Sequence, residues 1–294
     1  MKITPCLWFD NEAEEAAKFY VSIFPNSKIK YNEKYTTETP SNKPIGSVMT
    51  VTFELDGNEF MGLNGGDYFK INPSVSFTIN CKSVEEVDNL WEKLSRDGKV
   101  LMELAEYPFS KKYGWLEDKY GVSWQLIVRE DKQKIMPSLM FIQENNGMAK
   151  EAIDFYTNIF KNSKVVESAE YEEGEGNTKG YLKYSRFSLD GKDFIAMDGG
   201  VNHKFNFNEA ISFIITCKNQ EEINYYYDKL SVVPEAEICG WLKDKYEVSW
   251  QLIPEGYDEM MNSLDEENKK KVMEALLKMK RIDMNELERA REEK

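Results

Sequence analysis

The chain repeats itself once along its length, and this repeat constrains its fold more than any other feature. The segment AEEAAKFYVSIF returns later as AKEAIDFYTNIF, and GWLEDKYGVSWQLI returns as GWLKDKYEVSWQLI. The recurring segments are residues 13–24 and 149–160, 76–82 and 212–218, and 114–127 and 240–253. Because the segments keep their order, we divide the chain into two homologous domains, residues 1–131 and 132–260, followed by a tail over 261–294.

Strand and helix patterns alternate within each copy. Apolar residues at helical spacing predict a helix over 13–24, and Asp56-Gly57 between two apolar runs is a hairpin signal. Ser83, with Glu86 three residues later, is a capping box that starts a second helix. Strands are expected over residues 3–9, 48–55, 59–63, 75–81, 99–104, 114–116 and 122–128. This order is β-α-β-β-β, used twice per domain, so we expect an α+β fold in which the two modules of one domain form a curved eight-stranded mixed sheet.

The tail has the pattern of amphipathic helices. One helix carries an apolar stripe, and Asp283 begins another that carries Leu287 and Ala290. The stripe consists of Val272, Met273, Leu276, Leu277 and Met279. We expect it to dock on its own domain, and exchange of the tail with a second chain is the alternative.

The charge balance argues against one large class of partner. The 294 residues include 38 Lys and Arg against 52 Asp and Glu, a formal net charge of −14. A negative surface repels a phosphate backbone, so we expect no nucleic-acid partner. No apolar run reaches the ~20 residues that span a bilayer, and the first residues lack a signal-peptide pattern, so we expect no membrane partner and a cytoplasmic location. The four cysteines form no C-x-x-C pair and are expected to be reduced.

Two motifs carry a resemblance to a known family. Phe19-Tyr20 lies on the first predicted helix, and DKYGVSWQ at residues 118–125 leads into the last strand of the first copy. Together with the β-α-β-β-β order they resemble the vicinal oxygen chelate superfamily, which includes glyoxalase I, extradiol dioxygenases, and fosfomycin and bleomycin resistance proteins. The segments PCLWFD, NGG and GW followed by SWQ are similar to its PhnB-like branch, often labelled 3-demethylubiquinone-9 3-methyltransferase. The resemblance covers both copies, from residue 1 to about residue 255.

The resemblance implies a metal site at three strand positions, and this sequence places poor ligands there. The superfamily's glutamate near the end of the eighth strand aligns with Gln125 and, in the second copy, with Gln251. The first-strand position falls on Cys6 or a neighbour in the first copy and on Ser138 in the second. The fifth-strand position falls on Ser74 and Ala210. A hard divalent cation prefers anionic oxygen or imidazole ligands, so we expect no metal and no cofactor. The chain also shows no glycine-rich turn between a parallel strand and a helix, so we do not expect methyltransferase activity.

We expect a ligand pocket on the face of each sheet that lies opposite its helices. Alternation places Ser123 and Gln125 on that face in the first copy. Asn64 and Asp198 end equivalent strands that we expect to face inward, where they would present polar groups to an aromatic pocket. The alternative for both is capping of the Gly-Gly turn that follows. The candidate ligand-binding residues are Cys6, Trp8, Phe60, Asn64, Ser74, Ser123, Gln125, Ser138, Asp198, Ser249 and Gln251.

Two classes of function fit this pattern. The leading hypothesis is a metal-free protein that binds a small organic ligand, cationic or aromatic, because an acidic surface attracts cations. The alternative is an enzyme, either a lyase or dioxygenase with a displaced metal site or an acid–base enzyme that uses Asp198 or Glu103. We interpret His203 as a loop residue and Cys239 as an unactivated thiol. The two copies are expected to pack as an intrachain pseudo-dimer, with a homodimer of whole chains left open.

Overall fold

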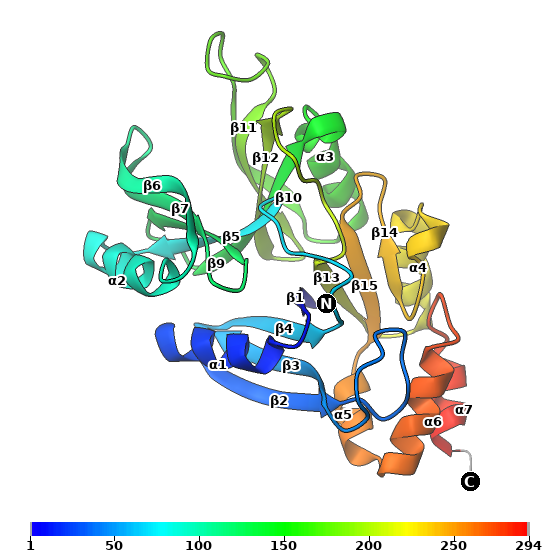
Figure 1. Ribbon diagram of the computed structural model, residues 1–294. Helices are drawn as coiled ribbons and strands as arrows, with labels where there is room; N and C mark the ends of the chain where they lie inside the picture. Colours follow the sequence, from blue (N-terminus) through cyan, green and yellow to red (C-terminus); the bar gives the residue numbers. More distant parts are fainter. Residues whose placement is uncertain (1, 293–294) are drawn as a thin grey trace.

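The computed structural model describes residues 2–292 and contains two mixed sheets and seven α-helices (Figure 1). The first sheet has the strand order β14-β15-β13-β1-β4-β3-β2, and the second has β10-β11-β12-β9-β5-β8-β7-β6. The first sheet contains β1 (Lys2–Phe9), β2 (Lys28–Lys34), β3 (Val48–Leu55), β4 (Asn58–Asn64), β13 (Ile211–Cys217), β14 (Trp241–Lys243) and β15 (Ser249–Pro254). The second contains β5 (Val75–Cys81), β6 (Lys99–Tyr107), β7 (Ser110–Glu117), β8 (Ser123–Val128), β9 (Ile135–Ile142), β10 (Lys164–Glu170), β11 (Leu182–Leu189) and β12 (Lys192–Gly200).

The helices follow the strands in the order that the repeat predicts. They are α1 (Ala13–Ile23), α2 (Val84–Leu94), α3 (Ala149–Ile159), α4 (Gln220–Leu230), α5 (Tyr257–Ser263), α6 (Glu266–Leu276) and α7 (Met284–Glu292), with short 3-10 helices η1 (Gln143–Asn145) and η2 (Pro234–Ala236). The predicted α+β class, built from tandem β-α-β-β-β modules, is confirmed.

Each sheet joins modules from different copies of the repeat, and here the predicted arrangement was wrong. β1 pairs antiparallel with β13 of the second copy, with Cys6 opposite Ser212. β5 likewise pairs antiparallel with β9, with Ser76 opposite Ser138. We expected the two modules of one domain to share a sheet. Alternation fixes which side chains share a face but not which strand edges pair, so the sequence pattern does not reveal this exchange.

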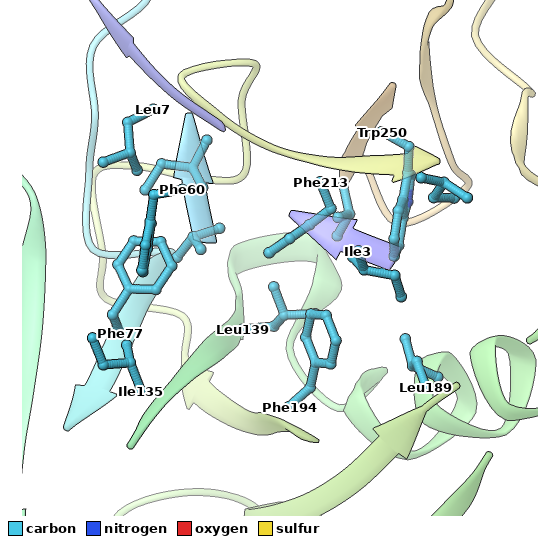
Figure 2. Close-up of a cluster of buried hydrophobic side chains, with 14 of the residues drawn as sticks. Ile3, Leu7, Phe60, Phe77, Ile135, Leu139, Leu189, Phe194, Phe213 and Trp250 are labelled. Atoms are coloured by element: carbon cyan, nitrogen blue, oxygen red, sulfur yellow. The ribbon is translucent and has the colours of Figure 1, made fainter. Parts of the chain in front are cut away.

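The two modules of one copy pack through their sheet faces instead. Phe60 of β4 lies against Phe77 of β5, with ring centroids 5.2 Å apart, and Phe194 of β12 lies against Phe213 of β13 at 5.4 Å. Figure 2 shows these residues in a buried cluster that also holds Leu139 of β9. We call this side of each sheet the packed face and the opposite side the cavity face.

One buried carboxylate in each copy ties the helix of one module to the last strand of the other. Asp118 Oδ2 accepts hydrogen bonds from the Tyr20 hydroxyl at 2.7 Å and from Trp124 Nε1 at 2.8 Å. Burial raises the pKa of Asp118 to about 6, although these donors and two backbone N–H groups oppose that shift. Asp244 makes the corresponding bonds in the second copy, both at 2.8 Å. The aspartate of the repeated DKY motif therefore holds modules together on the packed face.

The first sheet has seven strands and not the predicted eight. The second copy forms η2 and the three-residue β14 where the first copy forms the long β6–β7 hairpin. β2 was not among the strands assigned from alternation, because its residues are polar and mostly exposed. The hairpin at Asp56-Gly57 is confirmed, and so is the capping of α2 by Ser83, whose Oγ accepts from the Glu86 N–H at 3.2 Å.

The tail and the four residues before it form α5, α6 and α7, drawn in orange and red in Figure 1. α6 begins after its N-cap Asp265, and much of the predicted apolar stripe is buried. The tail lies against the first sheet, where Tyr31 of β2 donates a hydrogen bond to Asp258 of α5 and Thr37 donates one to Glu274 of α6. None of the helices within residues 2–292 has both the length and the apolar character needed to cross a membrane.

Candidate ligand-binding site

A cavity of about 430 Å³ lies on the cavity face of the first sheet. Side chains from β1, β2, β3, β4, β13, β14 and β15 line it, together with η2, α5 and α6. Because β1–β4 come from the first copy and β13–β15 from the second, both copies contribute to one site. Most of the lining is apolar: Trp8, Met49, Met61, Leu63, Phe69, Ile214, Trp241, Met273, Leu276 and Leu277.

Three aromatic rings form one corner of the cavity. Trp8 meets Phe69 edge to face at 5.0 Å between ring centroids and meets Trp241 in the same way at 5.9 Å. Trp8 Nε1 donates to the Gly66 carbonyl at 2.7 Å, which fixes the orientation of the indole. The ring lies directly over Gly65, where a Cβ atom would come within 2.2 Å of it. Glycine at this position therefore makes room for an aromatic wall.

Three polar side chains meet where the two copies join. Gln251 Nε2 donates to Ser212 Oγ at 2.9 Å, and the Cys6 thiol interacts with both side chains. Burial raises the pKa of Cys6 to about 12, so this thiol is protonated at neutral pH. Gln251 Oε1 accepts no hydrogen bond within residues 2–292 and belongs to the cavity lining. The carbonyl oxygen of this amide is thus free to meet a ligand.

The equivalent position in the second sheet is filled by a tyrosine. There Gln125 Nε2 donates to Ser76 Oγ at 2.8 Å, and Gln125 Oε1 accepts from the Tyr113 hydroxyl at 2.8 Å. In the second copy of the repeat, Cys239 stands in the place of Tyr113. The smaller side chain removes both the ring and the donor. The replacement of Tyr113 by Cys239 therefore leaves the amide open to the cavity.

Buried polar atoms without a hydrogen bond gather around the first sheet. Within residues 2–292, five buried side-chain oxygens make none, and each comes from this sheet, the loop after β2 or α5. They are Glu33 Oε1, Thr36 Oγ1, Thr52 Oγ1, Ser249 Oγ and Tyr257 Oη. An unpaired buried polar atom costs ~1–3 kcal/mol, which a ligand group that bonds to it can recover.

Glu33 is the most unusual of these groups. It lies on β2 opposite Thr50 of β3, and its side chain lines both the main cavity and an adjoining hollow of about 290 Å³ beside α6. Burial, together with the nearby Asp258 carboxylate, raises the pKa of Glu33 to about 7, and Lys269 of α6 opposes this shift. Glu33 is therefore divided between its charged and neutral forms near physiological pH.

The structure places the eleven sequence-predicted site residues in three groups. Cys6, Trp8 and Gln251 line the cavity. Ser249 lies two residues before Gln251 on β15 and therefore faces the same side of the sheet. The others of the cavity face, Ser123, Gln125 and Ser138, belong to the second sheet, and Ser74 precedes β5 and donates to the Asn206 carbonyl. Phe60, Asn64 and Asp198 lie away from the cavity.

The interpretation of Asn64 and Asp198 as pocket residues was wrong. Asn64 Oδ1 accepts from the backbone N–H of Ala13 at 2.9 Å, which caps the start of α1. Asp198 Oδ1 accepts from Gly147 and Ala149 N–H groups before α3, and burial raises its pKa. Both residues share a strand face with buried aromatics, because β4 and β12 turn Met61 and Met197 to the other side. The alternative, capping of the Gly-Gly turn that follows, is not seen either, because both side chains bond backbone N–H groups at the start of a helix.

Two further residues lie where the sequence suggested. His203 lies in a loop, with Nε2 2.9 Å from the Gly199 carbonyl oxygen and its ring near Phe205. Cys239 lines the cavity as a half-buried thiol, and burial raises its pKa to about 11. The structure brings no activating base to this thiol among its hydrogen-bond partners within residues 2–292.

Sequence reasoning missed Glu33 and the part that the tail plays in the site. Glu33 lies on a mostly polar and exposed strand, which alternation of apolar residues did not identify. The sequence predicted the apolar stripe of α6 but not the surface on which the helix docks. Met273 and Leu276 of this stripe line the cavity. A signal was present in KYNEKY, where Tyr31, Glu33 and Tyr35 alternate with polar residues.

The side chains at the position where the superfamily implies a divalent metal do not fit such an ion. Cys6 is a protonated thiol, Ser212 a hydroxyl and Gln251 an amide, whereas such cations bind anionic oxygen or imidazole. Within residues 2–292, no three His, Cys, Asp or Glu side chains are grouped so as to hold a metal ion. We therefore derive no reaction step through a metal.

Comparison with known proteins places the chain in a family. Residues 1–127 and 133–253 each match the family described as 3-demethylubiquinone-9 3-methyltransferase. A PhnB protein from Bacillus cereus is 44% identical; the match covers 44% of this chain and 100% of that protein, with a TM-score of 0.41. A protein from Staphylococcus aureus is 33% identical; the match covers 44% of this chain and 97% of that protein, with a TM-score of 0.19.

Glyoxalase I from Zea mays shares the fold over most of the length, with a TM-score of 0.54 and 13% sequence identity. The match covers 86% of this chain and 92% of the glyoxalase. No curated protein matches the sequence. Since the family's pattern occurs twice and covers most of the 294 residues, the chain is a tandem member of the 3-demethylubiquinone-9 3-methyltransferase family, with the glyoxalase-like fold of the vicinal oxygen chelate superfamily.

Proposed function

We propose that this protein binds a small, largely apolar organic molecule in the cavity of the first sheet, without a metal or another cofactor. The observation that carries the proposal is an aromatic-lined cavity whose walls include Glu33 and Tyr257, each of which holds a buried oxygen without a hydrogen bond within residues 2–292. A native fold pairs nearly all its buried polar atoms, so a cluster of exceptions in one place favours a ligand site.

The size of the cavity agrees with this function. A volume of about 430 Å³ suits a molecule of one or two rings. Trp8 and Trp241 offer flat apolar surface, and Gln251 offers a carbonyl oxygen that orients a hydrogen-bond donor. These features support binding. The two thiols in the described lining, Cys6 and Cys239, have raised pKa values and are not activated as nucleophiles.

Methyl transfer, which the family description names, finds little support in the site. A nucleotide-type methyl donor is usually held by a glycine-rich turn that leads from a strand into a helix. Gly65-Gly66 follows β4, and Gly199-Gly200 ends β12, and each is followed by a loop. We therefore assign binding and not methyl transfer to the cavity.

The test uses N-phenyl-1-naphthylamine, an uncharged dye that brightens in apolar cavities. We expect one dye site per chain, with energy transfer from Trp8 and Trp241. Leu63→Trp should fill part of the cavity and weaken dye binding ~tenfold or more, because the added side-chain volume occupies space that the ligand needs.

The matched control is Met197→Trp. Met197 lies opposite Met140 on the cavity face of the second sheet, as Leu63 lies opposite Trp8 in the first. Dye affinity should be unchanged in this variant. Absence of dye binding to the native protein, or equal losses in both variants, would overturn the proposal.

A further inference from the structure

We propose that the ligand is an organic cation with an apolar body, and that its charged group binds at Glu33. This inference rests on the proposed function and names the class of ligand for the same cavity. It assigns to Glu33 a role that neither the repeat nor the family match suggests.

The charged residues around the cavity are all acidic. Glu33, Glu209, Glu235 and Asp258 belong to the lining, whereas none of the lining residues, all within the described part of the chain, is Lys, Arg or His. Low-dielectric walls with charges of one sign concentrate the field inside a cleft, so this cavity attracts cations and repels carboxylates and phosphates. The acidic composition of the whole chain, at −14, acts in the same direction.

Only one of these carboxylates is half-buried and without a partner within residues 2–292. Glu209 pairs with Lys243 at 3.1 Å, and Asp258 accepts the hydrogen bond of Tyr31. Glu235 is exposed on η2 at the edge of the site. Glu33 Oε1, in contrast, is shielded from solvent and makes no hydrogen bond within residues 2–292. The Glu33 side chain lines the cavity, so a cation bound there would compensate the charge of this carboxylate.

The aromatic corner offers a second interaction for the same class of ligand. Lysine and arginine side chains stack on rings elsewhere in the protein, as Lys119 does on Phe19 and Arg281 on Tyr227. None of the cation–ring contacts found within residues 2–292 involves Trp8, Phe69 or Trp241. These rings are therefore available to an alkylammonium group, which binds aromatic faces well.

Protonation of Glu33 should control this binding. The pKa of Glu33 is raised to about 7 by burial and by Asp258 of α5, and Lys269 of α6 opposes the shift. Other titratable groups beside it are Tyr257 of α5, whose pKa is raised, and Glu266 of α6. Its chain neighbours Lys34 and Tyr35 line the same hollows. If the cation binds only the ionised form, its affinity falls ~tenfold from pH 8 to pH 6, because the competent fraction falls by that factor. A neutral ligand should show no such dependence.

The experiment compares two isosteric probes that displace N-phenyl-1-naphthylamine. One is (2-naphthylmethyl)trimethylammonium, which is charged at every pH, and the other is 2-neopentylnaphthalene, its uncharged carbon analogue. We expect the cation to bind ~tenfold or more tightly than the analogue at pH 8 and to lose this advantage toward pH 6. The wild-type protein alone supplies this result.

Variants then assign the effect to one carboxylate. Glu33→Gln should abolish the preference for the cation and its pH dependence while the uncharged probe binds as before. Glu235→Gln, which neutralises an exposed carboxylate of the same lining, should retain both. Equal affinity of the two probes for the native protein at pH 8, or a preference that survives Glu33→Gln, would overturn this inference. Failure of both probes and of the dye to bind would instead overturn the proposed function together with it.

Discussion

The two sheets are built from the same kinds of module, yet their cavity faces differ. In the second sheet, Trp115 Nε1 donates to Ser123 Oγ at 2.7 Å. In the first sheet the equivalent Trp241 turns toward Trp8, and Ser249 Oγ makes no hydrogen bond within the described residues. The second sheet thus satisfies its polar groups internally, whereas the first leaves them around a cavity.

The far ends of the two faces differ in the same way. In the second sheet Arg186 of β11 forms ion pairs with Asp131 and Asp193, and Arg129 pairs with Glu167 of β10. In the first sheet the tail helices occupy the corresponding end and bring apolar side chains. A small number of substitutions, one shortened hairpin and the tail helices therefore separate the two faces.

The packed faces, unlike the cavity faces, are alike in both copies. Substitutions there should give the largest losses of stability. Asp118→Asn and Asp244→Asn should each lower the free energy of unfolding by ~3 kcal/mol. The amide NH₂ would face Trp124 Nε1 or Trp250 Nε1, and indole N–H groups only donate. Urea unfolding measures both variants. Losses that differ by more than ~1 kcal/mol would mean that the two copies differ in their cores as well.

The next prediction concerns the tyrosine that fills the second sheet. Tyr113→Ala should cost ~2–3 kcal/mol, because it removes a buried ring and leaves Gln125 without its donor. Cys239→Ala should cost under ~1 kcal/mol, since Cys239 is half-buried beside an existing cavity.

Tyr113→Ala should also create a second binding site for N-phenyl-1-naphthylamine. Dye titration would then give two sites per chain in this variant and one in Cys239→Ala. One site in both would show that more than a single ring separates the two faces.

The smallest effect is a pH dependence of stability in the ligand-free protein. The folded state raises the pKa of Glu33 from 4.5 to about 7, so the native state holds its proton more tightly than the unfolded chain. The resulting stability is present below pH ~4.5 and is lost as pH rises through 7. Glu33→Gln should therefore be more stable than wild type by ~1 kcal/mol at pH 8 and similar to it at pH 4.5, after allowance for solvent exposure. Unfolding curves at both values test the sign, and a variant less stable at pH 8 would contradict it.

The sequence by itself determined the local structure and the content of each module. Repeated segments predicted two copies, alternation predicted most strands, and the Asp56-Gly57 turn fixed one hairpin. It also identified Cys6, Trp8 and Gln251 as cavity residues. These predictions succeed because side chains alternate strictly along a strand and because turns require particular residues.

The tertiary structure alone decided which modules share a sheet, and with that the composition of the site. Cys6 and Gln251 meet only because β1 pairs with β13 of the other copy. Phe60 and Asn64 face the packed side, since the partner across that face is the second module of the same copy. Glu33 lines the cavity and the adjoining hollow because the tail helices cover β2. Edge pairing and helix docking join segments far apart in sequence through surfaces that several partners would satisfy, so no local pattern specifies them.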